Sequence, residues 1–362
     1  MSKSPALTPA TVLAMPLSGP SLRGRRLVLA GSAAVIVAAL LGCFAVAAAK
    51  NLGLDVRRQG DAFFFFFSAY ERVHFLIVAF FGVGVFLWAL IHRGSTDTSS
   101  ASGRAAGARF AMVAALVVAS VAGAGAWTIF DNYPFSMDEF AASFQARIFA
   151  GGKLEVSLPE PWRRFAFALS PIFISIDRTR GVWRSAYLPV YAGIRALFLK
   201  AGAEPWTNPV LAGASVLALG VVARRLWPNK IGYGWVAVAL LATSPQFLLT
   251  SMTAYAMPAY LAFHLAWLSL YLRGSRASLA ATPWLGVIAM GINNPLPHLL
   301  FAAPFLLRLF RSRRWGWASY FTFVYLVGFA GWWVWLSRIN QFGRGTSALT
   351  QFAFPAGEKA WL

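Results

Sequence analysis

Two adjacent carboxylates, Asp138 and Glu139, are the residues in this sequence whose types and placement point most directly to chemistry. They lie in the stretch 131–153, which follows an apolar segment that ends near Phe130. A carboxylate at a membrane edge can take a proton from an acceptor hydroxyl or amine, or bind a divalent cation that holds a phosphate. The structural alternative is that the pair caps the start of a helix, where negative charge is favourable.

The residues after the pair predict the element that positions it. Phe140, Phe144 and Ile148 recur at i, i+4 and i+8, which is typical of one apolar face of a short helix. Gly151 and Gly152 follow and are expected to end that helix. We therefore expect a helix in the membrane interface with the two carboxylates near its N-terminus.

The composition indicates a membrane protein. Of 362 residues, 58% are apolar and only 12% are charged, whereas soluble domains carry about 25% charged residues. Several segments of low charge exceed the length of about 18 residues that is needed to cross a bilayer. The sequence predicts an all-α, polytopic transmembrane bundle of about nine spans, with interfacial helices in a long external loop. We expect it in a bacterial inner (plasma) membrane.

The net charge of +20 invites a nucleic-acid partner. The basic residues, however, fall in short clusters between apolar segments, as the positive-inside rule describes for cytoplasmic loops. This distribution excludes nucleic acid as the expected partner.

The chain is expected to consist of four parts. Residues 1–26 form a disordered cytoplasmic tail, and 27–109 form a two-span hairpin followed by a flexible linker. Residues 110–336 form the membrane core, and 337–362 form an external tail. The basic residues that place the N-terminus in the cytoplasm are Arg23, Arg25 and Arg26.

The external loop of the core, 131–207, holds most of the acidic residues of the chain. Its apolar stretch 187–201 is interrupted by Arg195. A full span there would place Arg195 in hydrocarbon, at a cost of about 2.5–3.5 kcal/mol. An interfacial or re-entrant helix is the better interpretation.

Five short motifs follow one another between residues 138 and 251. The Asp-Glu pair precedes A-x-x-x-Q-A-R-I-F-A-G-G-K at 141–153, and YLPVY follows at 187–191. The runs ARRLW at 223–227 and TSPQFLLTS at 243–251 come next. Over roughly 110–335 the chain resembles the GT-C class of integral-membrane glycosyltransferases, most closely the protein mannosyltransferase and aminoarabinose-transferase group.

This resemblance implies transfer of a sugar from a polyprenyl-phosphate donor to an acceptor on the external face. It implies that Asp138 is the catalytic carboxylate and Glu139 its partner. Many members have a second Asp in the next external loop, but here 250–258 contains no acid. The need for a divalent metal ion is therefore left open, with Asp138 as its ligand if there is one. The chain ends earlier than most members, so we expect a shortened one.

Three cationic side chains are candidates for binding the phosphate of the donor. Arg147 and Arg184 flank the acidic motif and the Tyr187 element, and Arg binds phosphate through two parallel hydrogen bonds. His298, expected at a second external turn, can bind phosphate as an imidazolium. The alternatives are ion pairs with the acids of the loop, contacts with lipid headgroups, and an interfacial histidine.

Aromatic residues of the same loop are candidates for contacts with the substrate, because sugar rings stack on aromatic faces and isoprenoid chains pack against them. The alternative is the aromatic belt found at membrane interfaces. These residues are Tyr133, Trp183, Tyr187 and Tyr191.

The expected partners are thus a polyprenyl-phosphate-linked sugar and the membrane lipids. A non-catalytic transporter or flippase is a second hypothesis, but it predicts ionisable residues at mid-membrane depth, and the apolar segments contain few. An envelope-assembly protein without catalytic activity is a third.

Overall fold

The computed structural model describes residues 22–51, 75–84, 86–87, 101–166, 173–177 and 180–340. The expected terminal tails lie almost wholly outside these residues, and so does the expected linker up to residue 100. The part of that linker from 101 to 109 is helical and begins α4 (Ala101–Thr128). The chain divides into two compact units, Leu13–Asp97 and the rest. Each unit is described by itself.

The smaller unit contains the two helices of the expected hairpin. Helix α2 runs over Leu22–Asn51 and is apolar over Leu29–Ala45, and a second apolar helix covers Phe75–Gly84. A Cβ added at Gly42 would meet the Phe75 ring at 2.7 Å, so this glycine permits close packing of the two helices. Both described apolar stretches are shorter than the roughly 18–20 residues that a span needs.

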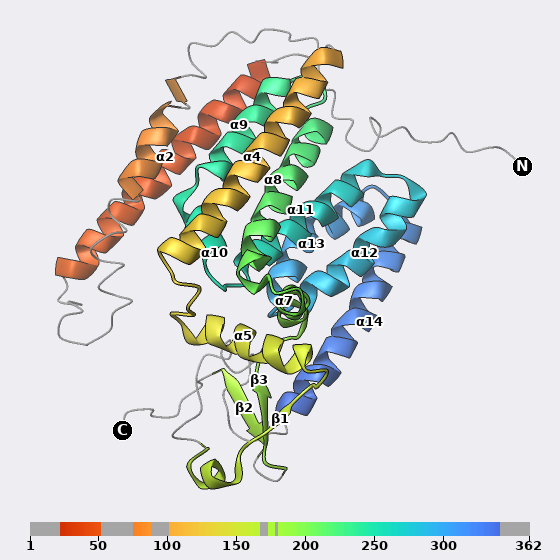
Figure 1. Cartoon of the computed structure of the whole chain (residues 1–362). Coiled ribbons are helices and arrows are strands. Elements are labelled where there is room, and N and C mark those ends of the chain that lie inside the picture. Colours follow the sequence, from red (N-terminus) through yellow and green to blue (C-terminus); the bar gives the residue numbers. More distant parts are fainter. Residues whose placement is uncertain are drawn as a thin grey trace, which may run out of the picture. The chain divides into compact units, whose positions relative to one another are not determined.

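The larger unit begins with a helical layer in which small side chains allow close approach. Helix α4 (Ala101–Thr128) packs against α8 (Thr207–Leu226), which packs against α11 (Met257–Arg273). Between α8 and α11 the chain forms α9 (Ile231–Ala242) and α10 (Pro245–Met252), and Figure 1 shows α4, α8 and α9 side by side. The core of this layer includes Ala111, Ala115, Val118, Ala212, Val216 and Val238.

Three further helices complete the unit: α12 (Arg276–Met290), α13 (Leu296–Arg311) and α14 (Trp315–Asn340). They pack with α11 around Trp267, which is fully buried. Its indole Nε1 donates a hydrogen bond to the Tyr325 hydroxyl at 2.8 Å, and that hydroxyl lies 3.1 Å from His298 Nε2. This core is therefore largely aromatic, with a short polar chain inside it.

A small sheet corrects the prediction that the fold is all-α. Strands β1 (Val156–Ser157), β3 (Val182–Ser185) and β2 (Ile174–Asp177) form an antiparallel sheet in the order β1-β3-β2. The strands are too short to show a period in the sequence. Arg180 links the two outer strands of the sheet, because its guanidinium pairs with Glu155, directly before β1, and with Asp177 at the end of β2, each at 2.7 Å.

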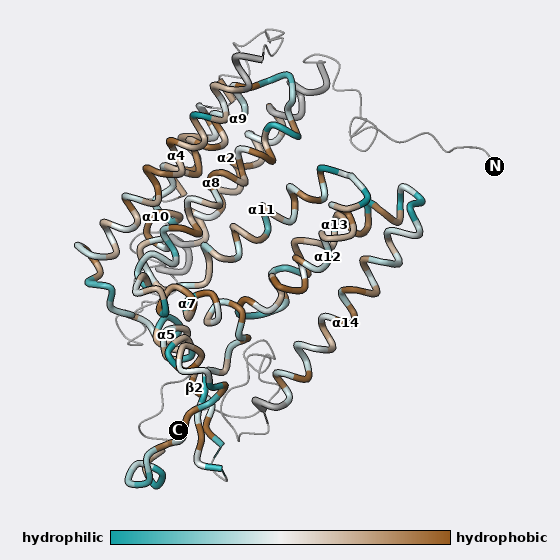
Figure 2. Tube along the Cα trace, turned by 45° about the vertical axis from the view of Figure 1, so that its right-hand side comes forward, coloured by the Kyte–Doolittle hydropathy of each residue, from teal (hydrophilic) through white to brown (hydrophobic). Residues whose placement is uncertain are grey.

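The prediction of about nine spans is not supported. In the described part of the chain, three helices are long and apolar enough to cross a membrane: Ala105–Thr128, Glu204–Leu226 and Trp315–Ser337. A fourth span results if α9 and α10, which are bent by 53° at their junction, are counted as one. Figure 2 shows the apolar colouring along these helices.

The other apolar segments form shorter helices. Helices α11, α12 and α13 have 17, 15 and 16 residues, below the length of about 20 residues that usually spans a bilayer. Pro283 and Pro304 also lie inside α12 and α13. Hydrophobicity along the sequence does not separate these short, packed helices from complete spans. The structure supports membrane association, while the kind of membrane and the orientation remain predictions.

The close approach of α12 and α14 gives a prediction about stability. A Cβ added at Gly286 would lie 2.5 Å from His298 Nε2 and from the Tyr325 hydroxyl. Gly286→Ala should destabilise the detergent-solubilised protein by about 1–3 kcal/mol through overpacking, measured as a lower unfolding temperature. Gly316→Ala is the control, because nothing lies within 4 Å of its added Cβ. Equal unfolding temperatures for the two variants would contradict this packing.

Candidate functional site

Helix α5 (Met137–Ala150) carries the two carboxylates, and its ends follow from local sequence. Ser136 is the N-cap: its hydroxyl oxygen accepts a hydrogen bond from the Glu139 amide at 3.3 Å and its hydroxyl donates to Glu139 Oε1 at 3.1 Å. Gly151 ends the helix, and Gly152 has φ +73°, a left-handed conformation that favours glycine. The predicted helix and its glycine end are confirmed.

The expected apolar face of α5 is only partly the face that is buried. Ile148 is buried, but Phe140 is 38% exposed, and Phe144 is half-buried with its ring edge-on to Trp183 at 5.3 Å. Helix α5 packs against α7 (Val190–Lys200), and four of its seven buried residues are small. The buried residues are Glu139, Ala141, Ala142, Ser143, Gln145, Ala146 and Ile148. Small side chains permit close approach of helices. The prediction missed this buried face because it used only the i, i+4 spacing of large apolar residues.

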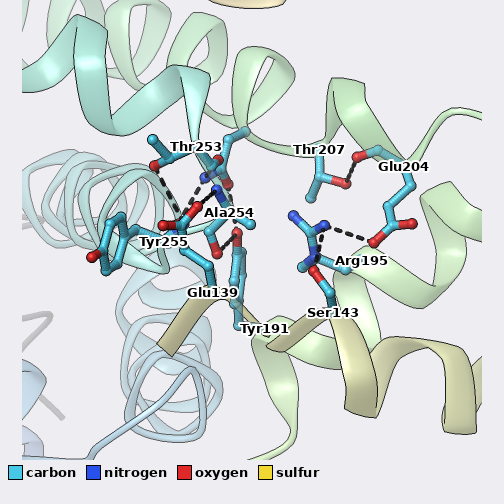
Figure 3. A network of polar contacts seen from close by, with 10 residues as sticks. Glu139, Ser143, Tyr191, Arg195, Glu204, Thr207, Thr253, Ala254 and Tyr255 are labelled. Carbon is cyan, nitrogen blue, oxygen red and sulfur yellow. Dashed lines mark hydrogen bonds and ion pairs between the residues drawn. The ribbon is translucent and has the colours of Figure 1, made fainter. Parts of the chain in front are cut away.

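Glu139 is buried, with 2% of its surface exposed, and is not among the residues that line the cavity at Asp138. Its Oε2 accepts a hydrogen bond from the Ala254 amide at 2.9 Å (Figure 3). Ala254 lies in the break between α10 and α11, where the backbone leaves the helical hydrogen-bond pattern. Glu139 therefore satisfies a backbone group of this break, which is a structural role.

Two further buried side chains satisfy the carbonyl groups of the same break. Asn208 Nδ2 donates to the Thr253 oxygen at 2.6 Å and to the Tyr255 oxygen at 2.7 Å. The Tyr191 hydroxyl lies 3.0 Å from Asn208 Oδ1 and 2.9 Å from the Ala254 oxygen. Burial raises the pKa of the Tyr191 phenol, so it remains a protonated donor. The hydroxyl of Tyr191, a predicted substrate contact, is thus engaged inside the protein.

Arg195 is buried inside the protein beside this network (Figure 3). Its Nη2 donates to Glu204 Oε1 at 2.7 Å and to Ser143 Oγ at 3.1 Å. These bonds join α7 to α5 and to the short helix η3 (Glu204–Trp206). Helix α7 has 11 residues, too few for a span. The Arg195 guanidinium is paired with the Glu204 carboxylate inside the protein. In a full span it would instead have been exposed to hydrocarbon.

Asp138, by contrast, lines a cavity of about 110 Å³ between α5, α7, α11 and the α12–α13 connection. Its Oδ1 accepts a hydrogen bond from the Tyr187 hydroxyl. Burial, reinforced by the carboxylate of Asp138, raises the pKa of Tyr187, so the phenol is a donor at neutral pH. The Tyr187 ring stacks on Phe173 at 5.1 Å, which fixes the direction from which the hydroxyl reaches Asp138.

Neutral polar groups and apolar side chains form the rest of the cavity wall. Ser185, Tyr255 and Asn293 are polar residues of the lining, and Leu188 and Ile292 are apolar ones. The Tyr255 hydroxyl and the Asn293 amide can form hydrogen bonds with hydroxyl groups of a ligand. Tyr255 and Asn293 had not been predicted, because no acid marks their loops. Asn208 was also missed, although an Asn directly before Pro209 in an apolar helix was an available signal.

The three predicted phosphate ligands do not line this cavity. Arg147 is exposed in the last turn of α5, and Arg184 is buried on β3 with its guanidinium 5.8 Å from the Trp335 ring centre. His298 is fully buried in the first turn of α13, which corrects its expected position at an external turn. The rings of His264 and Trp267 on α11 and of Tyr325 on α14 lie around it. The prolines near His298 in the sequence gave no sign of these tertiary contacts.

Two predicted aromatic contacts also lie off the cavity wall. Tyr133 is 64% exposed in the connection before α5, where its ring meets Phe135 edge-on at 5.7 Å. Trp183 lies on β3 against Phe144. Of the predicted aromatic set, the structure brings Tyr187 and Tyr191 to Asp138.

The described residues include no group of three or more His, Cys, Asp or Glu side chains arranged to hold a metal ion. Both oxygens of Glu139 accept hydrogen bonds within the protein, from Ser136 and Ala254. Asp138 is thus the carboxylate of the doublet that faces the cavity.

No family model matches this chain, and the curated proteins and the solved structures likewise yielded no match.

The role of Asn208 gives a prediction that is independent of activity. Asn208→Ala removes the donor to two buried carbonyl groups and one of the two acceptors near the Tyr191 hydroxyl. Leaving such groups unpaired costs about 1–3 kcal/mol each, so the unfolding temperature should fall clearly. Asn229→Ala, at an exposed position between α8 and α9, is the matched control. An Asn208 variant as stable as this control would show that the break does not depend on these bonds.

Proposed function

We propose that this protein is a membrane glycosyltransferase of the GT-C type. It moves a sugar from a polyprenyl-phosphate donor to an acceptor on the external face of the membrane. The observation that carries the proposal is the separation of the two carboxylates: Glu139 is held inside the protein, whereas Asp138 lines a cavity next to a tyrosine donor. In the sequence, the proposal rests on the order of motifs, which resembles the order found in this class.

In the proposed reaction Asp138 acts as general base. It takes the proton of an acceptor hydroxyl as the acceptor oxygen forms a bond to the anomeric carbon of the sugar. The bond from that carbon to the phosphate oxygen breaks, and its electron pair leaves with the polyprenyl phosphate. Tyr187 positions the carboxylate through its hydrogen bond, since a correctly held base lowers the cost of reaching the reactive geometry.

The cavity suits the sugar or the acceptor better than the donor phosphate. Its polar residues Ser185, Tyr255 and Asn293 are neutral, and the predicted cations lie elsewhere. Of the lining residues, Asp138 carries the carboxylate that a divalent ion would use, with waters and substrate oxygens as its other ligands. The proposed proton transfer does not depend on such an ion, and we place the phosphate outside this cavity.

Replacement of Asp138 tests the proposed base. The envelope glycan or glycolipid that disappears on deletion of the gene should return with the wild-type protein but not with Asp138→Asn. We expect transfer to fall about 100-fold or more, as is usual for loss of a general base. Mass spectrometry of envelope glycans measures the product, and immunoblots of membranes check that the variants are equally abundant.

Asp131→Asn is the matched control, because it makes the same change at an exposed residue off the cavity wall. It should restore the product fully. If Asp138→Asn restores the product as well as this control, Asp138 is not the base, and a carrier or assembly role gains support.

Replacement of Tyr187 tests the positioning of Asp138. Tyr187→Phe keeps the ring that stacks on Phe173 and removes the hydroxyl that donates to the carboxylate. A hydrogen bond to a charged group contributes about 1.5–3 kcal/mol, so kcat should fall roughly 10-fold or more with little change in KM. Tyr133→Phe, at an exposed ring, should leave both constants unchanged. Unchanged kcat in Tyr187→Phe would contradict the positioning role.

A further inference from the structure

A second cavity lies at the end of α8 and α9 that is remote from α5 and the sheet. It has a volume of about 90 Å³ and lies where the chain passes from α8 to α9. Figures 1 and 2 both place this connection at the opposite end of the helices from α5. The residues that matter for its chemistry are Arg224, Trp227, Lys230 and Ile231.

In the part of the chain that the structure describes, the two cations of this cavity have no acidic partner. The sequence contains no Asp or Glu between Glu204 and Glu358, and in the described part of the chain no ion pair joins Arg224 or Lys230 to a carboxylate. Arg225 differs, because its Nη1 donates to Ser269 on α11 at 3.0 Å. Arg225 therefore links two helices, whereas Arg224 and Lys230 contribute uncompensated positive charge to the cavity.

The surroundings of the cavity have the character of a membrane interface. Trp227, Tyr233 and Trp235 are each about two-fifths exposed, next to the end of the candidate span Glu204–Leu226. The Lys230 ammonium lies 5.1 Å from the Tyr233 ring centre. Partly exposed aromatic rings and basic residues at a span end are typical of the headgroup region of a bilayer.

The cavity lies at the end of a candidate span. Helix α8 leaves the span Glu204–Leu226 here, so an anionic group held by Arg224 and Lys230 would lie where the apolar part of a bilayer begins. Val236 and Leu240 are 58% and 62% exposed on the face of α9 turned away from the residues that line the cavity, and they form a lipid-facing surface of this helix. The position at a span end favours a lipid over a soluble anion.

We propose that this cavity binds the phosphate headgroup of an anionic phospholipid, at the membrane face opposite to Asp138. The Arg224 guanidinium matches two phosphate oxygens, and Lys230 supplies a second charge. Its acyl chains extend from the end of the span into the apolar part of the bilayer. Basic pockets at the ends of membrane helices bind anionic headgroups in this way. The site does not depend on glycosyl transfer.

The test measures lipid binding by the full-length purified protein. Delipidated protein in detergent is titrated with phosphatidylglycerol or phosphatidylcholine, and bound lipid is counted by native mass spectrometry. Wild type should prefer phosphatidylglycerol, and the double variant Arg224→Gln/Lys230→Gln should bind it roughly 10-fold more weakly. Arg224→Lys retains the charge but loses the two parallel hydrogen bonds, so its affinity should fall between those of the wild type and the double variant.

The matched control is Arg276→Gln/Arg311→Gln, which removes two exposed charges that do not line the cavity. It should bind phosphatidylglycerol like the wild type. Three results would overturn the proposal: equal loss of binding in both double variants, equal affinity for the two lipids, or displacement of phosphatidylglycerol by an equal concentration of inorganic phosphate. The last result would identify a site for soluble anions.

Discussion

The hydrogen bond from the Ala254 amide to the Glu139 carboxylate is the interaction on which the candidate site depends. A helix break within an apolar bundle leaves backbone groups that must find partners inside the protein. Glu139, Tyr191 and Asn208 provide them from three different helices. This interaction holds α5 against the α10–α11 break and thereby fixes where the neighbouring residue, Asp138, can lie.

The adjacency of the carboxylates then explains their different environments. Successive residues on a helix point about 100° apart, so when Glu139 is directed into the protein, Asp138 is turned toward a different side. In this structure that side is the cavity, where Tyr187 donates to the carboxylate. The two acids thus have complementary roles. Glu139 is buried and orients α5, and Asp138 remains in the cavity as the proposed base.

Charge is distributed unevenly along the larger unit. The acids that the structure describes lie between Asp131 and Glu204, around α5, the sheet and η3, where several form ion pairs. Among the described residues, the cations of the α8–α9 connection have no acidic partners. If the proposals hold, chemistry on a lipid-linked substrate takes place at one end, while a phospholipid binds at the other and anchors the helices in the bilayer.

Local sequence by itself determined the start and end of α5, because Ser136 can cap only the adjacent turn and Gly152 readily adopts a left-handed backbone. It also determined the apolar stretches of α4, α8 and α14, whose length and low charge are visible without tertiary contacts. Tertiary structure decided which acid of the doublet is buried, since the partner of Glu139 lies 115 residues away. It likewise decided that α11, α12 and α13 are short packed helices, because hydrophobicity alone does not distinguish burial in protein from burial in lipid.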